Sequence, residues 1–219
     1  MENKSSIQVQ PGHYDKLSYN NLERFISYYY QIETVRKLNV KNVLEIGAGN
    51  KFVASILKDV GIDVTVCDFD ISLNPDIVSD VRDIKLPNNG FDLVLACQVL
   101  EHIPFEDVSK ALTEIVRISR RYAVISLPYR STHFELLLKF PFIRKIFKKN
   151  FFDFCIRKAL KFPGFVISKQ HYWEIDNGDY TLAKVRKEIL RYFQIIEEFS
   201  PPLNKFHYFF VLELKNILK

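Results

Sequence analysis

The sequence predicts an α/β protein with a mostly parallel sheet and helices on both faces of that sheet. Short β-rich runs alternate with helical patterns over about the first 130 residues, which is typical of parallel strands joined by helical crossovers. The last 30 residues or so carry two β-rich runs in succession, which favours a hairpin at the sheet edge with one antiparallel strand. The apolar share of 47% is normal for a folded domain.

The first part of the chain contains five predicted elements and one irregular crossover. Apolar side chains recur at three- and four-residue steps within residues 14–38, which predicts an amphipathic helix. A strand over Asn42–Ile46, a helix over 53–60 and a strand over 63–67 follow. Only about eight residues separate the last of these from a short strand at 76–79, so the helix of that crossover is expected to be absent or reduced to a turn.

The second half continues the alternation and then departs from it. The continuous apolar run 91–96 predicts a strand buried on both faces, followed by a helix over 108–119, a strand over 122–127 and two terminal strands over 192–199 and His207–Leu214. We therefore divide a single domain, 1–219, into an N-terminal helix (14–38), a ligand-binding core (40–129), a basic, aromatic, helical lid insertion (130–170) and a C-terminal helix with a β-hairpin (171–219).

A glycine-containing loop, Gly47-Ala48-Gly49-Asn50-Lys51, follows the first predicted strand. In an open parallel sheet, ligands bind outside the carboxyl ends of the strands, so this loop lies where a ligand is expected. A dinucleotide site would place a third glycine where Phe52 stands, which argues against a pyrophosphate ligand. A ligand without phosphate needs close backbone approach and a nearby carboxylate, which Glu45 would supply.

These residues, with others in the same order, resemble class I methyltransferases that use S-adenosylmethionine (SAM). The resemblance covers residues 40–130 and rests on the glycine loop, Asp68 at the end of VTVCD, the run SDVRDIKLPNNGFDLVLACQVLEHIP and its Leu100-Glu101-His102 stretch. It implies a Rossmann-like, seven-stranded sheet and SAM as cofactor. One departure is Lys51, which replaces the last glycine of the motif and is tolerable if its backbone is helical.

The resemblance also implies a role for each matching position. Glu45 would bind the SAM ammonium group, Asp68 the ribose hydroxyls and Asp80 the adenine amine, with Asp70 and Asp83 as alternative acids. The complete cofactor set is Glu45, Gly47, Ala48, Gly49, Asp68, Asp80, Val81, Cys97 and Gln98.

Histidines provide the candidates for acid–base chemistry. The ordinary pKa of a histidine side chain suits proton removal near neutral pH, so His102 and His171 are the candidate catalytic residues, and Tyr172 and Glu174 the candidate substrate contacts. The alternative is that His102 is structural and that the aromatic residues beside His171 anchor a loop to the core. The three cysteines have no metal-site spacing, and no metal site is predicted.

The charge distribution points to a partner for the insertion. Residues 130–169 hold ten Lys or Arg against two acids, a net +8, whereas the whole chain is +5. The insertion is expected to cap the substrate pocket or to contact an anionic membrane surface through 139–161. Nucleic acid is a third partner class but an unexpected one, because no RNA-binding appendage stands out.

The resulting hypothesis is methyl transfer by in-line displacement to oxygen or nitrogen of a small molecule or of a glycan- or lipid-linked intermediate. The alternatives are a SAM-binding scaffold or sensor without turnover, and an RNA methyltransferase. The N-terminal segment is polar and two cysteines lie in apolar runs, so a cytoplasmic protein, with peripheral contact at the inner membrane face, is expected.

Overall fold

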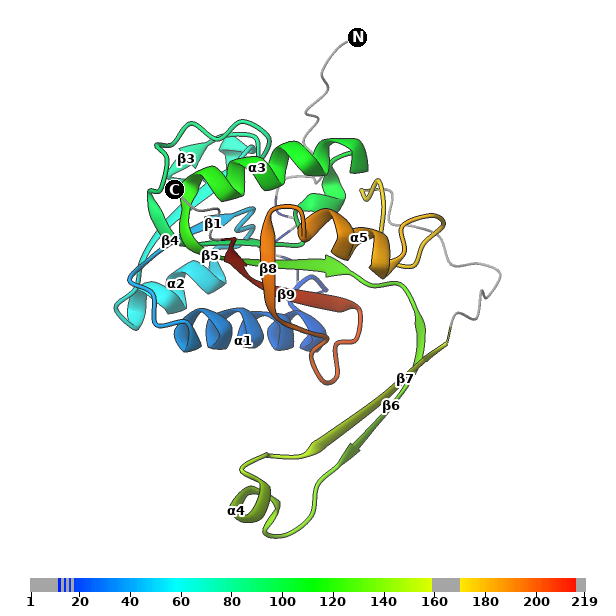
Figure 1. Ribbon diagram of the computed structural model, residues 1–219. Coiled ribbons are helices and arrows are strands. Elements are labelled where there is room, and N and C mark those ends of the chain that lie inside the picture. Colours follow the sequence, from blue (N-terminus) through cyan, green and yellow to red (C-terminus); the bar gives the residue numbers. More distant parts are fainter. Residues whose placement is uncertain (1–11, 13, 15, 17, 159–169, 216–219) are drawn as a thin grey trace.

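The computed structural model describes residues 12, 14, 16, 18–158 and 170–215. Its centre is a seven-stranded sheet in the order β3-β2-β1-β4-β5-β9-β8 (Figure 1). The strands are β1 (Asn42–Ile46), β2 (Asp63–Asp68), β3 (Ile77–Val78), β4 (Phe91–Cys97), β5 (Ser119–Pro128), β8 (Phe193–Phe199) and β9 (His207–Leu214). Neighbouring strands from β3 to β5 pair in parallel, and β9 pairs antiparallel with both β5 and β8. The predicted α/β class and terminal hairpin are confirmed.

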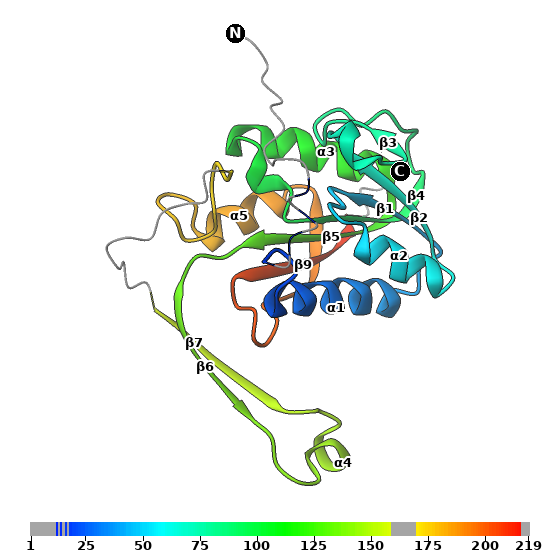
Figure 2. The ribbon, with the colours of Figure 1, turned by 180° about the vertical axis from the view of Figure 1, so that it is seen from behind.

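Helices cover both faces of this sheet. Helices α1 (Leu22–Lys37) and α2 (Phe52–Asp59) lie on one face, and α3 (Val108–Ile118) and α5 (Leu182–Ile189) lie on the other (Figures 1 and 2). The central strands present apolar side chains to both layers; Leu93 and Leu95 join the cluster under α1 and α2, while Val94 and Ala96 join the one under α3. A strand buried on both faces reads as a continuous apolar run, as 91–96 does.

The second crossover lacks an α-helix, as the sequence predicted. A single 3-10 turn, η1 (Ile71–Leu73), leads from β2 to β3. The carboxylate of Asp70 caps this turn by accepting a hydrogen bond from the Ser72 amide at 2.8 Å. The strand order reverses between β1 and β4, because the crossover from β1 to β2 and the crossover from β4 to β5 leave on opposite sides. The carboxyl ends of β1 and β4 therefore form the expected ligand position.

The insertion after β5 is not the predicted helical lid. Strands β6 (Thr132–Leu138) and β7 (Phe152–Lys158) form an antiparallel ribbon, which we call the arm, and the short helix α4 (Ile143–Phe147) lies at its tip. Both views show the arm extending away from the sheet and its helices (Figures 1 and 2). The prediction was wrong because the residues flanking the tip alternate with period two, which is the strand period.

Both strands of the arm are anchored to the loop between β8 and β9. The buried Lys205 ammonium forms ion pairs with Glu135 on β6 and Asp153 on β7. The Arg157 guanidinium donates to the hydroxyl groups of Ser131 and Ser200, each at 2.6 Å. These charged contacts hold both strands of the arm against the body. Within the part of the chain that is described, no helix has the length and apolar character needed to cross a bilayer.

Candidate active site

The glycine loop after β1 makes two close contacts that only glycine permits. Gly47 has φ +70°, and a Cβ there would lie 2.6 Å from Cγ2 of Val99, which follows β4. Gly49 has φ +52°, and a Cβ there would lie 2.9 Å from the Tyr14 ring. The Gly47 amide donates to the Cys67 carbonyl at 2.8 Å, which holds the loop over the end of β2. The loop thus has the tight backbone that close approach to a ligand requires.

Lys51 does not have the ordinary helical backbone that we expected of it. Its φ is +58° and its ψ is +18°, which is the left-handed conformation that a glycine would adopt without strain. Its ammonium group donates to the Asn74 carbonyl beyond η1. The next residue, Phe52, begins α2 and stacks on Tyr28 of α1 with ring centroids 5.1 Å apart. The motif position therefore keeps its glycine-like backbone although the residue is lysine.

Glu45 lies near the end of β1 as a buried carboxyl group with an unpartnered oxygen. The residue is 5% exposed, and its Oε2 atom accepts no hydrogen bond from the described residues. Burial raises the pKa of Glu45 to about 8, although the Ala54 amide and the Lys58 charge act in the opposite direction. An unpartnered carboxylate is costly, so this position favours a cationic ligand group that would pair with it.

Asp68 and Asp70 are both buried at the end of β2, but they are used differently. One oxygen of Asp70 is committed to the cap of η1. Asp68 accepts a hydrogen bond from the Asp70 amide at 3.0 Å through Oδ1. Burial raises the pKa of Asp68, and the neighbouring Asp70 charge adds to the effect, while backbone amides lower it. Asp68 is the last residue of β2 and therefore keeps the position that the resemblance assigns to the ribose ligand.

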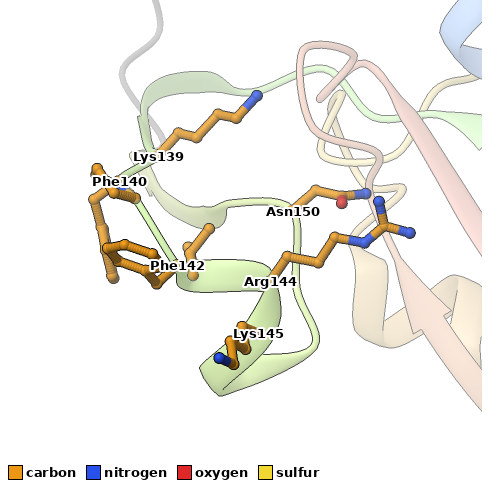
Figure 3. A pocket seen from close by; sticks show the side chains of 8 residues that line it. Lys139, Phe140, Phe142, Arg144, Lys145 and Asn150 are labelled. Carbon is orange, nitrogen blue, oxygen red and sulfur yellow. The ribbon is translucent and has the colours of Figure 1, made fainter.

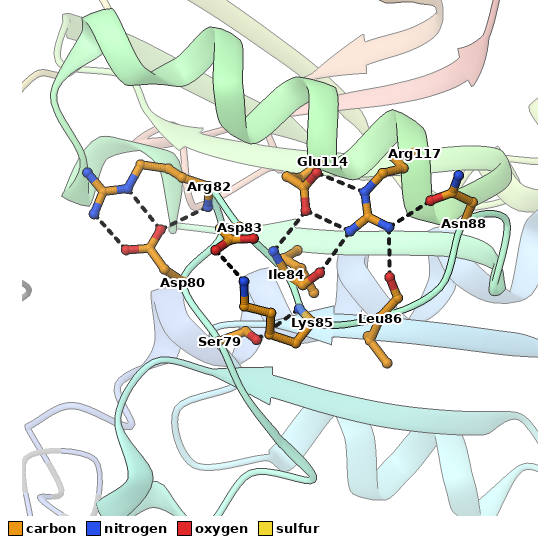
Figure 4. Close-up of polar contacts among 10 residues, drawn as sticks. All are labelled: Ser79, Asp80, Arg82, Asp83, Ile84, Lys85, Leu86, Asn88, Glu114 and Arg117. Atoms are coloured by element: carbon orange, nitrogen blue, oxygen red, sulfur yellow. Dashed lines mark hydrogen bonds and ion pairs between the residues drawn. The ribbon is translucent and has the colours of Figure 1, made fainter.

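Asp80 lies in an ion-pair network (Figure 4). Its carboxylate accepts hydrogen bonds from Arg82 Nε at 2.9 Å and Nη2 at 2.6 Å, and Arg82 also reaches Asp107 at 2.9 Å. These hydrogen bonds from Arg82 lower the pKa of Asp80. A carboxylate has about four lone-pair sites, so this pairing leaves acceptor capacity for a ligand amine. The alternative acid, Asp83, pairs with Lys85 at the surface, and the neighbouring Val81 is buried.

The residues after β4 form a strained turn. Gln98 has φ +57°, its amide donates to the Ser126 carbonyl at 2.9 Å, and its side-chain amide donates to the Ser126 hydroxyl at 3.3 Å. Burial raises the pKa of the Cys97 thiol to about 12, so this cysteine is not a thiolate nucleophile. A non-glycine residue in the left-handed region is retained where the surroundings demand it, often at functional sites.

Immediately beyond this turn, the 3-10 turn η2 (Leu100–His102) carries a buried acid. Glu101 is 0% exposed, and neither of its carboxylate oxygens accepts a hydrogen bond from another described residue. Burial raises the pKa of Glu101 to about 8, and the Glu174 charge adds to this effect. The ligand atoms of Glu101, His102 and His171 lie within 4.8 Å of one another, which makes them a candidate metal-ligand set.

The two candidate catalytic histidines are in contact. Their rings form an edge-to-face pair with centroids 5.0 Å apart. His102 Nδ1 is 2.9 Å from the Gln170 carbonyl oxygen, and His171 Nδ1 is 2.7 Å from Oε1 of Glu174. Since a carbonyl or carboxylate oxygen only accepts, each Nδ1 carries a proton, and the neutral form of each ring has its lone pair at Nε2. Burial, with the neighbouring His171, lowers the pKa of His102 to about 4.

The segment after His171 holds the two predicted substrate contacts in different environments. Tyr172 is 55% exposed, and its amide donates to the Glu101 carbonyl at 2.8 Å. Glu174 is fully buried, forms an ion pair with Arg130 and accepts a hydrogen bond from His171 Nδ1. These contacts orient His171, so a direct contact of Glu174 with substrate stays a prediction that its burial does not favour. Trp173 is anchored in the core by a hydrogen bond to the Ile103 carbonyl at 3.1 Å.

Three contributors to the site were not predicted from the sequence. Tyr14 covers Gly49, Arg130 pairs with Glu174, and Glu101 lies among the histidines as an acid without a partner. Only Glu101 had a signal in the sequence, because it belongs to the Leu100-Glu101-His102 stretch on which the resemblance partly rests. Nothing in the pattern of single residues joins Tyr14 or Arg130 to distant positions.

Comparisons with known proteins agree with this geometry. Residues 44–127 match the family model described as a methyltransferase domain. No curated protein sequence matches the chain. Among solved structures, the chain is similar to the 1,6-didemethyltoxoflavin-N1-methyltransferase of Burkholderia thailandensis, with a TM-score of 0.60 and 13% identity, over 93% of this chain and 84% of that one. It is also similar to the N-methyltransferase NodS of Bradyrhizobium japonicum, with a TM-score of 0.58 and 11% identity, over 89% of each chain.

The fold and the site together define a Rossmann-like protein that binds a small cofactor at the β1–β4 switch point. The glycine cradle and the unpartnered oxygen of Glu45 fit a cofactor that carries an ammonium group and no phosphate. The match to the methyltransferase-domain model spans residues 44–127, from β1 to β5, so the part of the chain that holds the glycine cradle and Glu45 is similar to methyltransferases.

Proposed function

We propose that the protein methylates an oxygen or nitrogen atom of a small molecule, or of a glycan- or lipid-linked intermediate. Bound SAM supplies an electrophilic methyl group on a sulfonium. The chain's own residues bind and orient: Glu45 pairs with the ammonium group, Asp68 accepts hydrogen bonds from the ribose, and the glycine loop gives close access. Methyl transfer then depends mainly on the position of the acceptor.

The pair of oriented imidazoles is the observation that carries the choice of acceptor atom. His102 follows β4 and lies one short turn beyond Val99, which contacts Gly47 of the cofactor loop. His171 follows the arm in the chain, and its ring packs against that of His102. Each ring presents an Nε2 lone pair, and such an atom can accept a proton or a hydrogen bond from a hydroxyl or amine group.

The similar structure from Burkholderia thailandensis is an N-methyltransferase named for a small molecule, 1,6-didemethyltoxoflavin, and this supports a small acceptor here. The basic arm supports an acceptor with an anionic carrier, such as a lipid phosphate, because its charge would attract one. We place this activity in the cytoplasm, as the sequence predicts.

Turnover assays test this function. Purified protein is incubated with SAM and a panel of hydroxylated and aminated acceptors, and S-adenosylhomocysteine (SAH) is quantified. SAH formation with an acceptor, reduced at least about tenfold in His171→Gln, would support the proposal, since general acid–base groups contribute about 10²–10⁴-fold. Tight binding of SAH without turnover on any acceptor would contradict it and favour the scaffold alternative.

A further inference from the structure

We propose that Glu101, His102 and His171 form a binding site for a divalent metal ion of the first transition row, such as Zn²⁺. The three ligand atoms lie within 4.8 Å of one another. Two neutral imidazoles and one carboxylate are the protein ligands of many catalytic zinc and non-haem iron sites, which keep further positions open for water or substrate. No such site is predicted by the spacing of the sequence, because His171 is distant from the other two in the chain.

The hydrogen bonds around the two histidines are those of metal ligands. A ligating histidine nearly always donates its second ring N–H to a carboxylate or a backbone carbonyl, which fixes the tautomer and the ring orientation. His171 donates Nδ1–H to Glu174, and His102 donates Nδ1–H to the Gln170 carbonyl. Glu174 is in turn held by Arg130. Each imidazole is therefore fixed with Nε2 as its coordinating atom.

The third ligand supplies an independent observation. Both oxygens of Glu101 are buried away from solvent and accept no hydrogen bond from other described side chains or amides. A buried acid without partners is costly, and a divalent cation would supply the missing interaction. Coordination at about 2 Å needs the three atoms to approach one another by a small rotation of their side chains.

A bound ion would occupy the Nε2 lone pairs of both histidines, so it would replace them as the group that contacts the acceptor. It would deepen the proposed function by selecting oxygen as the acceptor atom, and only this role depends on that function. An acceptor hydroxyl bound to the ion loses its proton to water more easily, because the ion acts as a Lewis acid. Its oxygen then forms the new bond to the methyl carbon, the carbon–sulfur bond breaks, and SAH leaves with the bonding electrons.

Titration with Co²⁺ tests binding without reference to activity, because bound Co²⁺ has visible absorption bands. We expect one equivalent per chain, displaced by one equivalent of Zn²⁺, and an affinity reduced by more than about 100-fold in Glu101→Gln and His171→Gln. Outer-shell changes alone usually cost about 10–100-fold. The control is His133→Gln, since His133 lies on the arm and is exposed.

Equal Co²⁺ affinity in wild type, Glu101→Gln and His171→Gln would overturn the metal site. Thermal unfolding checks that each variant is folded. If the buried Glu101→Gln does not fold, the Co²⁺ affinity of His171→Gln decides.

Chelation tests the catalytic role of the ion. If chelation abolishes SAH formation and Zn²⁺ restores it, the catalytic role is supported; full turnover after chelation overturns that role. If no acceptor gives SAH, the proposed function fails while Co²⁺ absorption still decides the site.

A second inference rests on the arm alone. We propose that its tip inserts into the surface of an anionic lipid bilayer. Residues 139–149 contain five Lys or Arg and no acid. None of these five cations forms an ion pair with a described acid, whereas the two acids of β6 and β7 are both bound by Lys205 of the body. The tip therefore keeps a full, uncompensated positive charge.

Exposed apolar side chains accompany this charge. Phe142 is 73% exposed and Ile146 65% exposed, and Phe140 and Phe147 pack edge to face beside them. Phe140, Phe142, Arg144 and Lys145 line a shallow pocket at the tip, where apolar and cationic groups lie together (Figure 3). Phenylalanines that enter the acyl boundary while lysines meet lipid phosphates are typical of an interfacial membrane contact.

The ribbon continues this apolar surface toward the body. The cross-strand pairs Phe134–Ile156 and Leu136–Phe154 place four apolar side chains on one face of the arm. All four are exposed. The charge of the tip favours lipid over a second copy of this chain, because two tips with five cations each would repel one another. It also directs the contact to the anionic cytoplasmic leaflet.

Co-sedimentation with vesicles of phosphatidylglycerol and phosphatidylcholine tests the contact. Each Lys or Arg near an anionic surface contributes about fivefold in affinity, so Lys145→Ala/Lys148→Ala should bind about 30-fold more weakly. Ile146→Ser should also weaken binding, by about fivefold or more. Its matched control is Leu22→Ser on α1, where the native side chain is 66% exposed on the body and should not affect binding.

Binding should disappear with pure phosphatidylcholine vesicles and weaken as salt is added. No sedimentation with anionic vesicles at low salt would overturn the proposal. An equal loss in Leu22→Ser would also overturn it, because the contact would then not be specific to the arm. If the protein does not bind vesicles but forms a concentration-dependent dimer that Ile146→Ser dissociates, the apolar face belongs to a contact with a second copy. If it binds single-stranded RNA more tightly than vesicles, the tip is a nucleic-acid contact.

Discussion

Binding of SAH should release a proton from Glu45 at neutral pH. The free protein holds this buried carboxyl group with a pKa of about 8, so about 0.9 of it is protonated at pH 7. An ammonium group placed beside it favours the ionised form and lowers the pKa. The proton must then leave, and it is taken up by the buffer.

The expected net value includes the ligand. The amino group of SAH, with an ordinary α-amino pKa near 7.7–8.0, must gain about 0.1–0.2 proton to bind as ammonium at pH 7. Net release is therefore about 0.7–0.8 proton at pH 7. The two effects cancel near pH 8, and net uptake of about 0.8 proton is expected at pH 9, where Glu45 is already ionised.

Isothermal titration calorimetry in buffers of different ionisation enthalpy measures the net number of protons released on binding. This number is the slope of the observed binding enthalpy plotted against the ionisation enthalpy of the buffer. Glu45→Gln is the matched variant, because glutamine keeps the shape of the side chain and cannot ionise. It should bind SAH more weakly and show no release at pH 7, while the uptake at pH 9 remains. Equal slopes for wild type and Glu45→Gln at pH 7 would refute the pairing of Glu45 with the ammonium group.

The same carboxyl group predicts the pH dependence of stability. Glu45 has a pKa of about 8 in the folded state, above the ordinary glutamate value of 4.5, so the folded protein binds more protons than the unfolded chain between these values. Its contribution is complete below pH 4.5 and is lost as the pH rises to 8. The loss in the free energy of unfolding is at most about 5 kcal/mol, because each unit of pKa difference between the folded and unfolded states contributes about 1.36 kcal/mol. Glu45→Gln should flatten this part of the profile in urea denaturation.

Four further changes test the local structure. Gly47→Ala should lower the free energy of unfolding by at least about 1–2 kcal/mol, since it adds strain at positive φ and a clash, and Val99→Ala should restore part of it in urea denaturation. Lys51→Gly should leave SAH affinity unchanged by calorimetry and relieve about 1 kcal/mol of backbone strain. Arg117→Ala removes charged hydrogen bonds to the loop before β4 (Figure 4) and should cost about 3 kcal/mol in the same urea assay. Lys205→Met leaves two acids unpaired and should destabilise the arm by about 3–5 kcal/mol, seen as faster hydrogen exchange in β6 and β7 with the body unchanged.

The body of the fold could be predicted from the sequence because its signals are local. The apolar run of β4, the glycine loop and the short passage from β2 to β3 each follow from residues that are neighbours in the chain. The crossover helix was expected to be absent, and η1 alone is found there. The strand order was not predicted, because it depends on pairings between strands that are distant in the chain, such as β1 with β4 and β5 with β9.

The arm could not be predicted in the same way, because its apolar residues fit two periods. Phe134, Leu136 and Leu138 alternate as in a strand, yet the lysines and phenylalanines of the tip recur at helical steps. What decides between them is the pairing of β6 with β7 and the anchoring of both by Lys205, and these contacts join positions far apart in sequence. The site shows the same limit, since Glu101 meets His171 only through tertiary structure.

Backbone strain on both sides of the β1–β4 switch point connects fold and function. Lys51 and Gln98 are non-glycine residues in the left-handed region, and each such residue costs about 1–2 kcal/mol. The strain at Gln98 is balanced by two hydrogen bonds to Ser126, and this turn carries Val99 against Gly47 and leads directly to Glu101. A relaxed turn would shift these residues relative to the glycine loop. We therefore infer that the backbone strain is the energetic cost of holding Val99 and Glu101, on the acceptor side of the site, in a fixed position relative to the glycine loop on the cofactor side.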